Sequence, residues 1–145
     1  MAWAKQQTSF VKALGMVMLL AIMFLLNGCG KDSMYIELVK SGHFTSEPNV
    51  EIGEAYDKYY DHPKWEFIET KNGKKIVQFT GTEKWDDEQA GSKVSVQFII
   101  TGDESFKVGT VKVDGVDMSL LGLDTMIARV PVGMYKIQKE IEENT

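Results

Sequence analysis

The chain has 145 residues with 16 basic and 21 acidic side chains, which gives a formal net charge of −5. Nucleic acid is a poor candidate partner for an acidic chain, because phosphate binding depends on clustered Lys and Arg side chains. The single cysteine rules out an intrachain disulfide. The length fits one small domain.

The first 28 residues have the organisation of a secretory signal peptide. Lys5 and Lys12 are its charged residues, and the following stretch 13–26 is apolar and free of charge. This stretch has the length of the apolar region of a signal peptide, whereas a membrane-spanning helix takes roughly 20 residues. The alternative is a short uncleaved membrane anchor with an incidental cysteine.

The four residues Leu26-Asn27-Gly28-Cys29 resemble the lipobox of bacterial lipoproteins. The resemblance implies that acyl chains are attached to Cys29, that the signal peptide 1–28 is removed just before it, and that residues 29–34 form the acylated cysteine and a tether. Two or three acyl chains hold a protein firmly at a membrane. The expected location is therefore the bacterial cell envelope, facing outside the cytoplasm. Gly30, in place of Asp, implies the outer membrane if the organism has one.

Two helices are predicted ahead of the strands. Residues 34–40 are apolar without a clean period and are interpreted as a short helix, with a strand as the alternative. Residues 52–60 give the clearest helical pattern, because apolar side chains recur at the spacing of one helix face. This face consists of Ile52, Ala55, Tyr56 and Tyr59. Pro63 predicts that the helix ends by about residue 62.

From Trp65 onward the apolar period changes to two, which predicts four strands. The segments 65–70 and 75–85 are joined by Asn72-Gly73, a strong hairpin signal. The segments 94–101 and 106–113 follow. A change of phase at Gly109-Thr110 predicts a β-bulge in the last strand.

Residues 118–130 are predicted to form a further helix, which Pro131 and Gly133 interrupt. Residues 131–145 are expected to be a charged extension that either docks as a helix or frays. The predicted domain is 35–130, of the α+β class, in the order α-α-β-β-β-β-α. Its four-stranded antiparallel meander is covered on one face by helices, and the other face is more polar.

Three segments resemble a family of small bacterial lipoproteins and membrane-tethered domains of unassigned function. They are Ile52–Tyr60, Pro63–Trp65 and Val77–Gly81, and the resemblance covers about residues 35 to 130. The expected arrangement is also similar to the β-lactamase-inhibitor-protein fold, which a small lipoprotein of the outer-membrane barrel assembly machinery shares. Fold similarity alone does not fix function.

Catalytic and metal-binding patterns are weak. His43 has no ligand-type neighbours at a useful spacing, and His62, beside Asp61, has no partner nucleophile, so the pair is interpreted as a turn. The acidic run Asp86-Asp87-Glu88 lacks the alternation and glycine of a calcium loop and is interpreted as a solvated loop. No catalytic residue, cofactor or metal ligand is predicted, and the chain is interpreted as a non-enzyme.

The aromatic residues divide into core and surface candidates. Tyr56 and Trp65 are expected in the core, whereas Tyr60, Trp85 and Ile99 are candidates for an exposed partner or ligand surface, since aromatic residues are enriched at interfaces. The predicted function is a membrane-anchored, non-enzymatic envelope lipoprotein that binds another envelope protein or macromolecule through its sheet face and loops. The alternative is a carrier or sensor of a small apolar or cell-wall ligand, held by the aromatic cluster.

Overall fold

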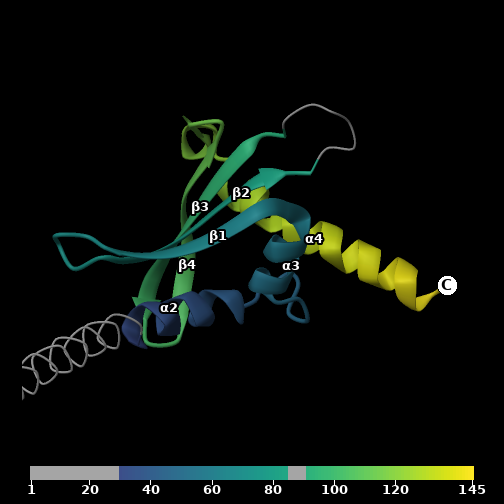
Figure 1. The fold of residues 1–145 in the computed structure, drawn as a ribbon, viewed down its shortest axis with the longest axis horizontal. Coiled ribbons are helices and arrows are strands. Elements are labelled where there is room, and N and C mark those ends of the chain that lie inside the picture. Colours follow the sequence, from purple (N-terminus) through teal and green to yellow (C-terminus); the bar gives the residue numbers. More distant parts are fainter. Residues whose placement is uncertain (1–29, 85–90) are drawn as a thin grey trace, which may run out of the picture. The chain divides into compact units, whose positions relative to one another are not determined.

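The computed structural model describes residues 30–84 and 91–145 of the chain. Ser33–Thr145 forms one compact unit. Within this unit, an antiparallel sheet has the strand order β1-β2-β3-β4-β5 (Figure 1). The predicted α+β class and the order of helices and strands are confirmed, and a short fifth strand extends the predicted meander.

The elements follow one another as α2 (Gly30–Lys40), α3 (Ile52–Tyr59), β1 (Tyr60–Glu69), β2 (Lys75–Glu83), β3 (Lys93–Gly102), β4 (Ser105–Val113), β5 (Val116–Asp117), the 3₁₀ turn η1 (Met118–Leu121) and α4 (Asp124–Glu143). The helical interpretation of residues 34–40 is confirmed. The helix predicted over 52–60 ends at Tyr59, and β1 begins directly after it.

The strand connections follow from local sequence. Gly73, with a φ of 76°, lies in the turn between β1 and β2, as the Asn72-Gly73 pair predicts. Between β3 and β4, Val96 pairs with Val111 but Phe98 pairs with Val108, so β4 holds one extra residue there. The β-bulge predicted at Gly109-Thr110 is confirmed, and it keeps the valines of β4 directed at the core.

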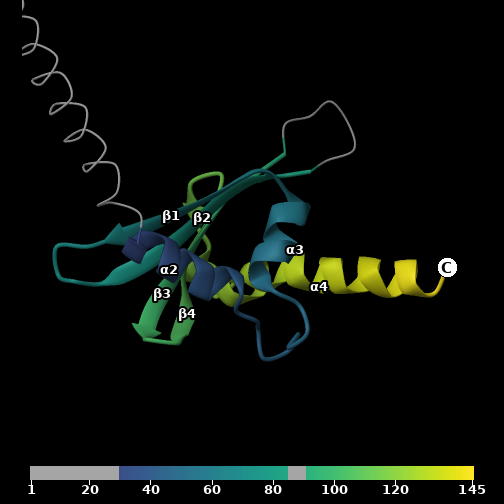
Figure 2. The ribbon, with the colours of Figure 1, turned by 60° about the horizontal axis from the view of Figure 1, so that its bottom comes forward.

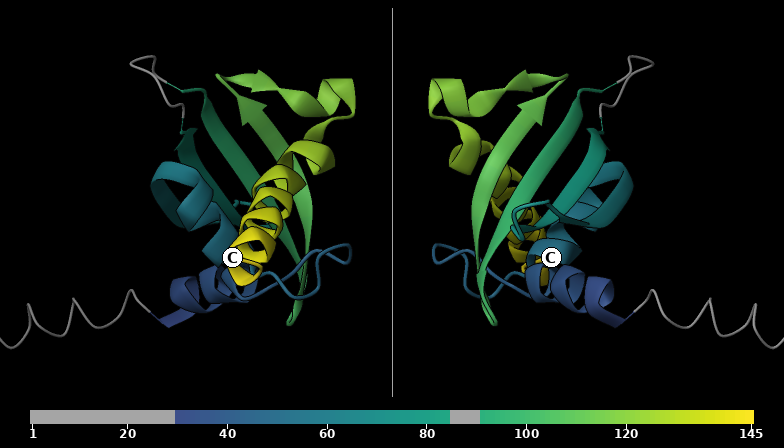
Figure 3. Two further views of the ribbon diagram at one scale, coloured as in Figure 1. Left: turned by 90° about the vertical axis from the view of Figure 1, so that its right-hand side faces the viewer. Right: turned by 90° about the vertical axis from the view of Figure 1, so that its left-hand side faces the viewer.

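Helices α3 and α4 cover one face of the sheet, as the two opposite views in Figure 3 show. The buried side chains of the strands alternate along β2, β3 and β4, and α3 contributes the face predicted from its 3.6-residue period. The core is made of Val39, Val50, Ile52, Ala55, Tyr56, Tyr60, Val77, Phe79, Val94, Val96, Phe98, Val111, Ala128 and Val132. Burial of this apolar surface is the main stabilising contribution to the fold.

Helix α4 runs without a break from Asp124 to Glu143 and passes through Pro131 (Figure 2). The predicted helix over 118–130 is therefore wrong at both ends, since residues 118–121 form a 3₁₀ turn. A proline inside a helix removes one hydrogen bond and crowds the preceding turn. Here Pro131 and Val132 are buried against the domain, and this packing offsets that cost. The domain thus continues past residue 130.

The opposite face of the sheet is more polar, as predicted, but an apolar row crosses it. Ile68 pairs with Ile76, and Ile76 pairs with Ile99, so the three isoleucines lie side by side on β1, β2 and β3. Gln78 and Gln97 also pair on this face and share a hydrogen bond of 3.0 Å. Ile99 further covers Gly109, where an added Cβ would lie 2.9 Å from its side chain.

Strand β1 lies at one edge of the sheet and is irregular near its start. Its register with β2 shifts between Asp61 and Lys64. His62 has a φ of 51°, in the left-handed region that non-glycine residues rarely adopt. Pro63 follows and offers no backbone N–H donor. The edge is therefore interrupted after the first two paired residues of β1.

Candidate interaction surface

The residues predicted from sequence to form an interaction surface lie in different environments in the structure. Cys29, Trp85 and the run Asp86–Glu88 lie outside the described residues. Tyr60 is 2% exposed, so its predicted place on an exposed surface is wrong. At the start of β1 its ring packs against Tyr59 and Phe79, and burial raises the pKa of its phenol. Ile99 is half-buried on the polar face of the sheet, within the isoleucine row.

Tyr56 lies at the centre of a closed aromatic cluster. Its ring is fully buried and lies edge-on to Phe79, with centroids 4.7 Å apart. The rings of Tyr60 and Trp65 each lie 5.7 Å from it, and Phe98 lies 6.0 Å from it. Such distances are those of favourable aromatic pairs. The cluster therefore fills the space between α3 and the sheet, as its core interpretation predicts.

Asp57, in α3, interacts with a residue of α2 and with a residue of β1. Its Oδ1 accepts a hydrogen bond from the indole Nε1 of Trp65 at 2.8 Å, and its Oδ2 pairs with Lys40 Nζ at 2.8 Å. The same ammonium lies 5.7 Å from the centroid of the Trp65 ring, a cation–π distance. Each oxygen of the Asp57 carboxylate thus has a partner, and these contacts hold the Trp65 ring in place against α3.

Neither histidine belongs to a group of three or more potential metal ligands in the described residues. His43 is exposed in the loop after α2, and His62 is exposed in the irregular start of β1. Over residues 30–84 and 91–145, no three His, Cys, Asp or Glu side chains are grouped as metal ligands. Within the same ranges, no helix combines the length and apolar character needed to cross a membrane.

A row of exposed apolar side chains follows α4. Five large apolar side chains, each between 40% and 62% exposed, line one side of this helix: Met126, Val130, Met134, Ile137 and Ile141. We call them the helix stripe. At 3.6 residues per turn they fall within an arc of roughly 80°. The buried residues of α4 lie on the other side, so the helix has one apolar side against the sheet and a second that faces solvent.

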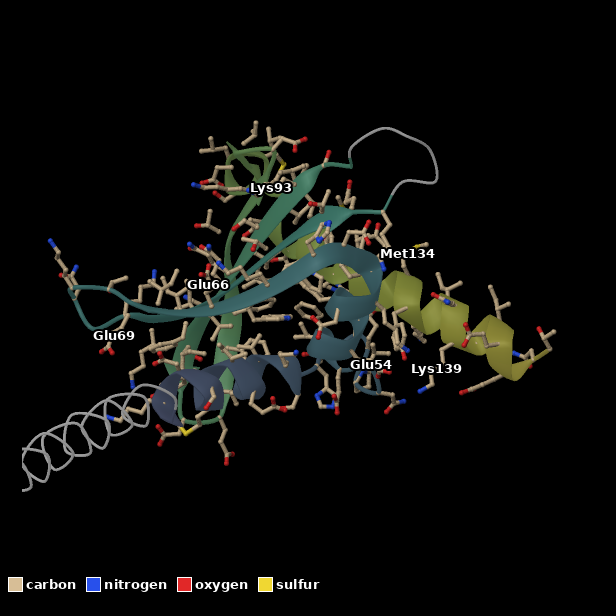
Figure 4. The ribbon with its side chains drawn as sticks, in the orientation of Figure 1. Glu54, Glu66, Glu69, Lys93, Met134 and Lys139 are labelled. Carbon is tan, nitrogen blue, oxygen red and sulfur yellow. The ribbon has the colours of Figure 1, made fainter. Side chains whose placement is uncertain are left out.

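The C-terminal two turns of α4 are more exposed than the rest of this helix. Every residue from 136 to 143 is exposed, and this part of α4 extends past the sheet (Figure 2). Figure 4 shows Met134, in the helix stripe, and Lys139 on different sides of this extension. Contiguous exposed apolar surface of this kind marks interaction sites, whereas single exposed residues do not.

A second exposed apolar group precedes α4 in the chain. Leu120 is 84% exposed, Leu121 is 65% exposed, and Val116 is exposed beside them in the sequence. We call these three residues the leucine turn. Asp117 fixes the turn, because its Oδ1 accepts a hydrogen bond from Ser119 N at 2.9 Å, and the contacts with Ser119 lower the pKa of this carboxyl. The leucines are thus presented to solvent by a capped turn.

A shallow apolar groove lies between α3 and the projecting part of α4. It is lined by Tyr59 together with Met134, Ile137 and Ile141 of the helix stripe. Polar contacts close one wall: Tyr135 Oη donates to Glu54 Oε1 at 2.6 Å, and Lys58 Nζ lies 3.2 Å from the same hydroxyl. The hydrogen bond from Tyr135 lowers the pKa of the Glu54 carboxyl.

Sequence reasoning identified only part of this surface. The pattern of Met134, Ile137 and Ile141 is visible in the sequence, but the predicted break at Pro131 separated it from Met126 and Val130. The signal that could have joined them is the continuous spacing of 4, 4, 3 and 4 residues along 126–141. Leu120 falls within the helix predicted over 118–130, and its helical spacing with Leu123 and Ile127 favoured a place on the buried side of that helix.

Comparisons with protein-family models, with curated proteins and with solved structures give no match to this chain. The resemblances to the lipobox and to the family of small lipoproteins therefore stay predictions from sequence. An assignment of function has to be argued from the surface of the molecule.

Proposed function

We propose that this protein is a lipid-anchored domain of the bacterial cell envelope whose task is to bind another protein, not to catalyse a reaction. The anchor is the acylated Cys29 expected from the lipobox resemblance. The observation that supports the binding role is the exposed apolar surface formed by the leucine turn and the helix stripe. Clustered exposed apolar side chains of this kind often mark sites of interaction with another protein.

The charges around the leucine turn favour a protein partner over a membrane surface. Asp114 precedes it, Asp117 lies within it and Asp124 follows it, whereas Lys112, which pairs with Asp117 between β4 and β5, is the one basic residue in the segment 112–124. Envelope membranes carry anionic headgroups, which attract clustered Lys and Arg and repel carboxylates. A partner with an apolar centre and a basic rim would match this part of the domain.

The packing of the aromatic cluster favours protein binding over the carriage of a small apolar ligand. A carrier needs a cavity between α3 and the sheet, but the rings of Tyr56, Phe79 and Trp65 occupy that space at centroid distances of 4.7 to 5.7 Å. A ligand would have to displace core side chains, and core packing is costly to disturb.

Site-specific photo-crosslinking in cells tests the binding role. A photoreactive amino acid replaces Leu120 in the full-length chain, and Gln97, on the polar face of the sheet, is the matched control position. We expect an adduct of one defined protein mass from position 120 and none from position 97. Adducts with lipid alone, or equal labelling from both positions, would contradict a protein partner at the leucine turn.

Metabolic labelling with a fatty acid tests the anchor separately. Wild-type chain should incorporate the label and fractionate with membranes, and Cys29→Ser should do neither, because it lacks the thiol to which the acyl group is attached. Labelling that persists in Cys29→Ser would refute the anchor while leaving the result at Leu120 intact.

A further inference from the structure

Strand β4 leaves part of its outer edge without a neighbouring strand. Among the described residues, β5 pairs only with Lys112 and Val113, so the part of β4 before them pairs with β3 alone. The loop 41–50 passes close to this edge, since a Cβ added at Gly42 would lie 2.5 Å from the ring of Phe106. In the described chain, however, the backbone of this loop makes no hydrogen bond to the backbone of β4. The first part of the β4 edge is therefore open.

The direction of the backbone groups along this edge follows from the ladder between β3 and β4. Asp114 N donates a hydrogen bond of 2.8 Å to Lys93 O, and the residue pairs of an antiparallel ladder alternate between bonded and non-bonded pairs. With the extra residue at the β-bulge, this alternation makes Lys107 bond to β3. The N–H and C=O groups of Phe106 and Val108 then point away from β3. They form the free row of an edge strand.

A groove of about 700 Å³ lies along this edge. Its lining comes from β4, from the end of α2 with the loop that follows it, and from the start of α4 (Figure 3). The apolar part of the lining is partly buried and consists of Leu38, Phe44, Phe106 and Val108. The rest is largely polar. An apolar hollow beside free backbone donors and acceptors suits an extended peptide, whose backbone adds a strand while alternate side chains enter the hollow.

The opposite edge of the sheet, along β1, is less suitable for an added strand. Its paired region carries Lys64, Glu66 and Glu69, and charged side chains are one device that discourages strand addition. The open segment 105–108 of β4 contains one charged residue, Lys107. The choice between the two edges therefore favours β4.

A second copy of this chain fits the open edge poorly. Two such edges related by a two-fold axis share both free residues when Phe106 of each copy lies opposite Val108 of the other. This arrangement places Lys107 directly opposite Lys107 of the second copy, and like charges at opposed positions are destabilising. The same exposed lysine favours an acidic residue in the strand of a different protein.

We propose that the open edge of β4 binds an extended segment of another protein as an added strand. Two apolar side chains of this segment, opposite Phe106 and Val108, enter the groove, and an acidic residue between them lies opposite Lys107. Hydrogen bonds between the two backbones supply affinity, and the groove and the lysine supply selectivity. The inference goes beyond the proposed function, because it rests on a strand edge and not on the leucine turn or the anchor.

Peptide selection tests the expected order of residues. Full-length chain in detergent micelles is immobilised and exposed to a phage-displayed library of random peptides long enough to form one strand. The enriched peptides should share the consecutive order apolar, acidic, apolar. Lys107→Glu should change the central residue to a basic one, because it reverses the charge opposite that residue. Lys71→Glu, at an exposed lysine between β1 and β2, is the matched control and should keep the wild-type preference.

Synthetic versions of one selected peptide test the backbone hydrogen bonds. Methylation of the peptide nitrogens that face β4 should weaken binding at least about tenfold, whereas methylation of the intervening nitrogens should not, because only alternate N–H groups face one neighbouring strand. Binding that relies on side chains alone would not distinguish the two sets of nitrogens.

Hydrogen exchange, followed for single residues by NMR, tests the edge without any substitution. In the free full-length chain, the amides of Phe106 and Val108 should exchange at least about tenfold faster than the amide of Lys107, which bonds to β3. Both amides should become protected when a selected peptide is bound.

The proposal is overturned if no peptide is enriched, if Lys107→Glu selects the same peptides as wild type, or if both sets of methylation have equal effects. Protection of the Phe106 and Val108 amides in the free chain would also overturn it, and protection that rises with protein concentration would assign the edge to a second copy. An adduct at Leu120 without peptide binding removes only the strand addition. Peptide binding without an adduct at Leu120 contradicts only the proposed role of the leucine turn.

Discussion

The hydroxyl of Tyr56, in α3, donates a hydrogen bond of 2.6 Å to the backbone carbonyl of Ala128, in α4. The two residues are 72 positions apart in the sequence, and the bond is buried. Ala128 lies three residues before Pro131, which removes the helical donor to the carbonyl of Ile127 one position earlier. A core tyrosine thereby joins α4 to α3 close to this missing helical hydrogen bond.

Tyr56→Phe should lower the free energy of unfolding by about 1 to 3 kcal/mol, because it leaves a buried carbonyl with a poorer set of donors while keeping the ring. Urea unfolding followed by far-ultraviolet circular dichroism measures the loss. Tyr59→Phe, at a half-buried position on the same helix, is the control and should cost less. Equal costs for the two substitutions would show that the bond to Ala128 contributes nothing measurable.

Alkaline pH should unfold the domain. Burial raises the pKa of the Tyr56 phenol well above its usual value of 10.0. The unfolded chain loses this proton at lower pH than the folded chain, so this stability is fully present below pH 10 and is lost as pH rises toward the folded pKa. The ultraviolet absorbance of tyrosinate, followed as pH rises past the usual tyrosine pKa of about 10, should show one group of tyrosines that ionises only with unfolding. Gradual ionisation of all tyrosines in the folded state would contradict the burial.

Asp57→Ala should loosen the junction of α2, α3 and β1. It removes the acceptor of the Trp65 indole and the partner of Lys40, which together contribute about 1 to 2 kcal/mol at this partly exposed site. The fluorescence of Trp65, measured with Trp3 and Trp85 replaced by Phe, should shift to longer wavelength. An unchanged spectrum and stability would show that ring packing alone positions Trp65.

Alanine substitutions at two glycines in helices should change the stability of the domain in opposite directions. A Cβ at Gly53 would lie 2.6 Å from Lys40 Cβ, so Gly53→Ala should destabilise the domain by about 1 to 3 kcal/mol through overpacking. Gly133 has open space around it, so Gly133→Ala should stabilise α4 by about 0.5 to 1 kcal/mol. Thermal unfolding of the two variants and the wild type gives both values. If Gly53→Ala also stabilised the domain, α2 and α3 could not approach as closely as the structure shows.

Local sequence patterns predicted most of the fold, because the spacing of apolar residues reflects which side chains are buried. The face of α3 that contains Ile52 and Tyr56, the hairpin at Gly73 and the bulge at Gly109 all follow from short-range periodicity and turn chemistry. The predictions that were wrong concern features that depend on contacts between residues distant in sequence. The helix through Pro131 persists because of packing that a local rule cannot include, and Tyr60 is buried because β1 begins directly at the end of α3.

The interaction surface was predicted less well than the fold. Periodicity shows which residues share a side of a helix, and Met126 to Ile141 do so plainly once α4 is continuous. It does not show that α4 has two apolar sides, of which only one meets the sheet. That distinction needs the position of the helix relative to β4 and α3.

The irregular start of β1 limits how another chain can extend the sheet. An open strand edge is a template on which another chain can add a strand, and this is a common route to aggregation. The register shift between Asp61 and Lys64, together with the missing donor of Pro63, interrupts the row of backbone groups along this edge. A strand added along the whole length of β1 would therefore lose hydrogen bonds at this point.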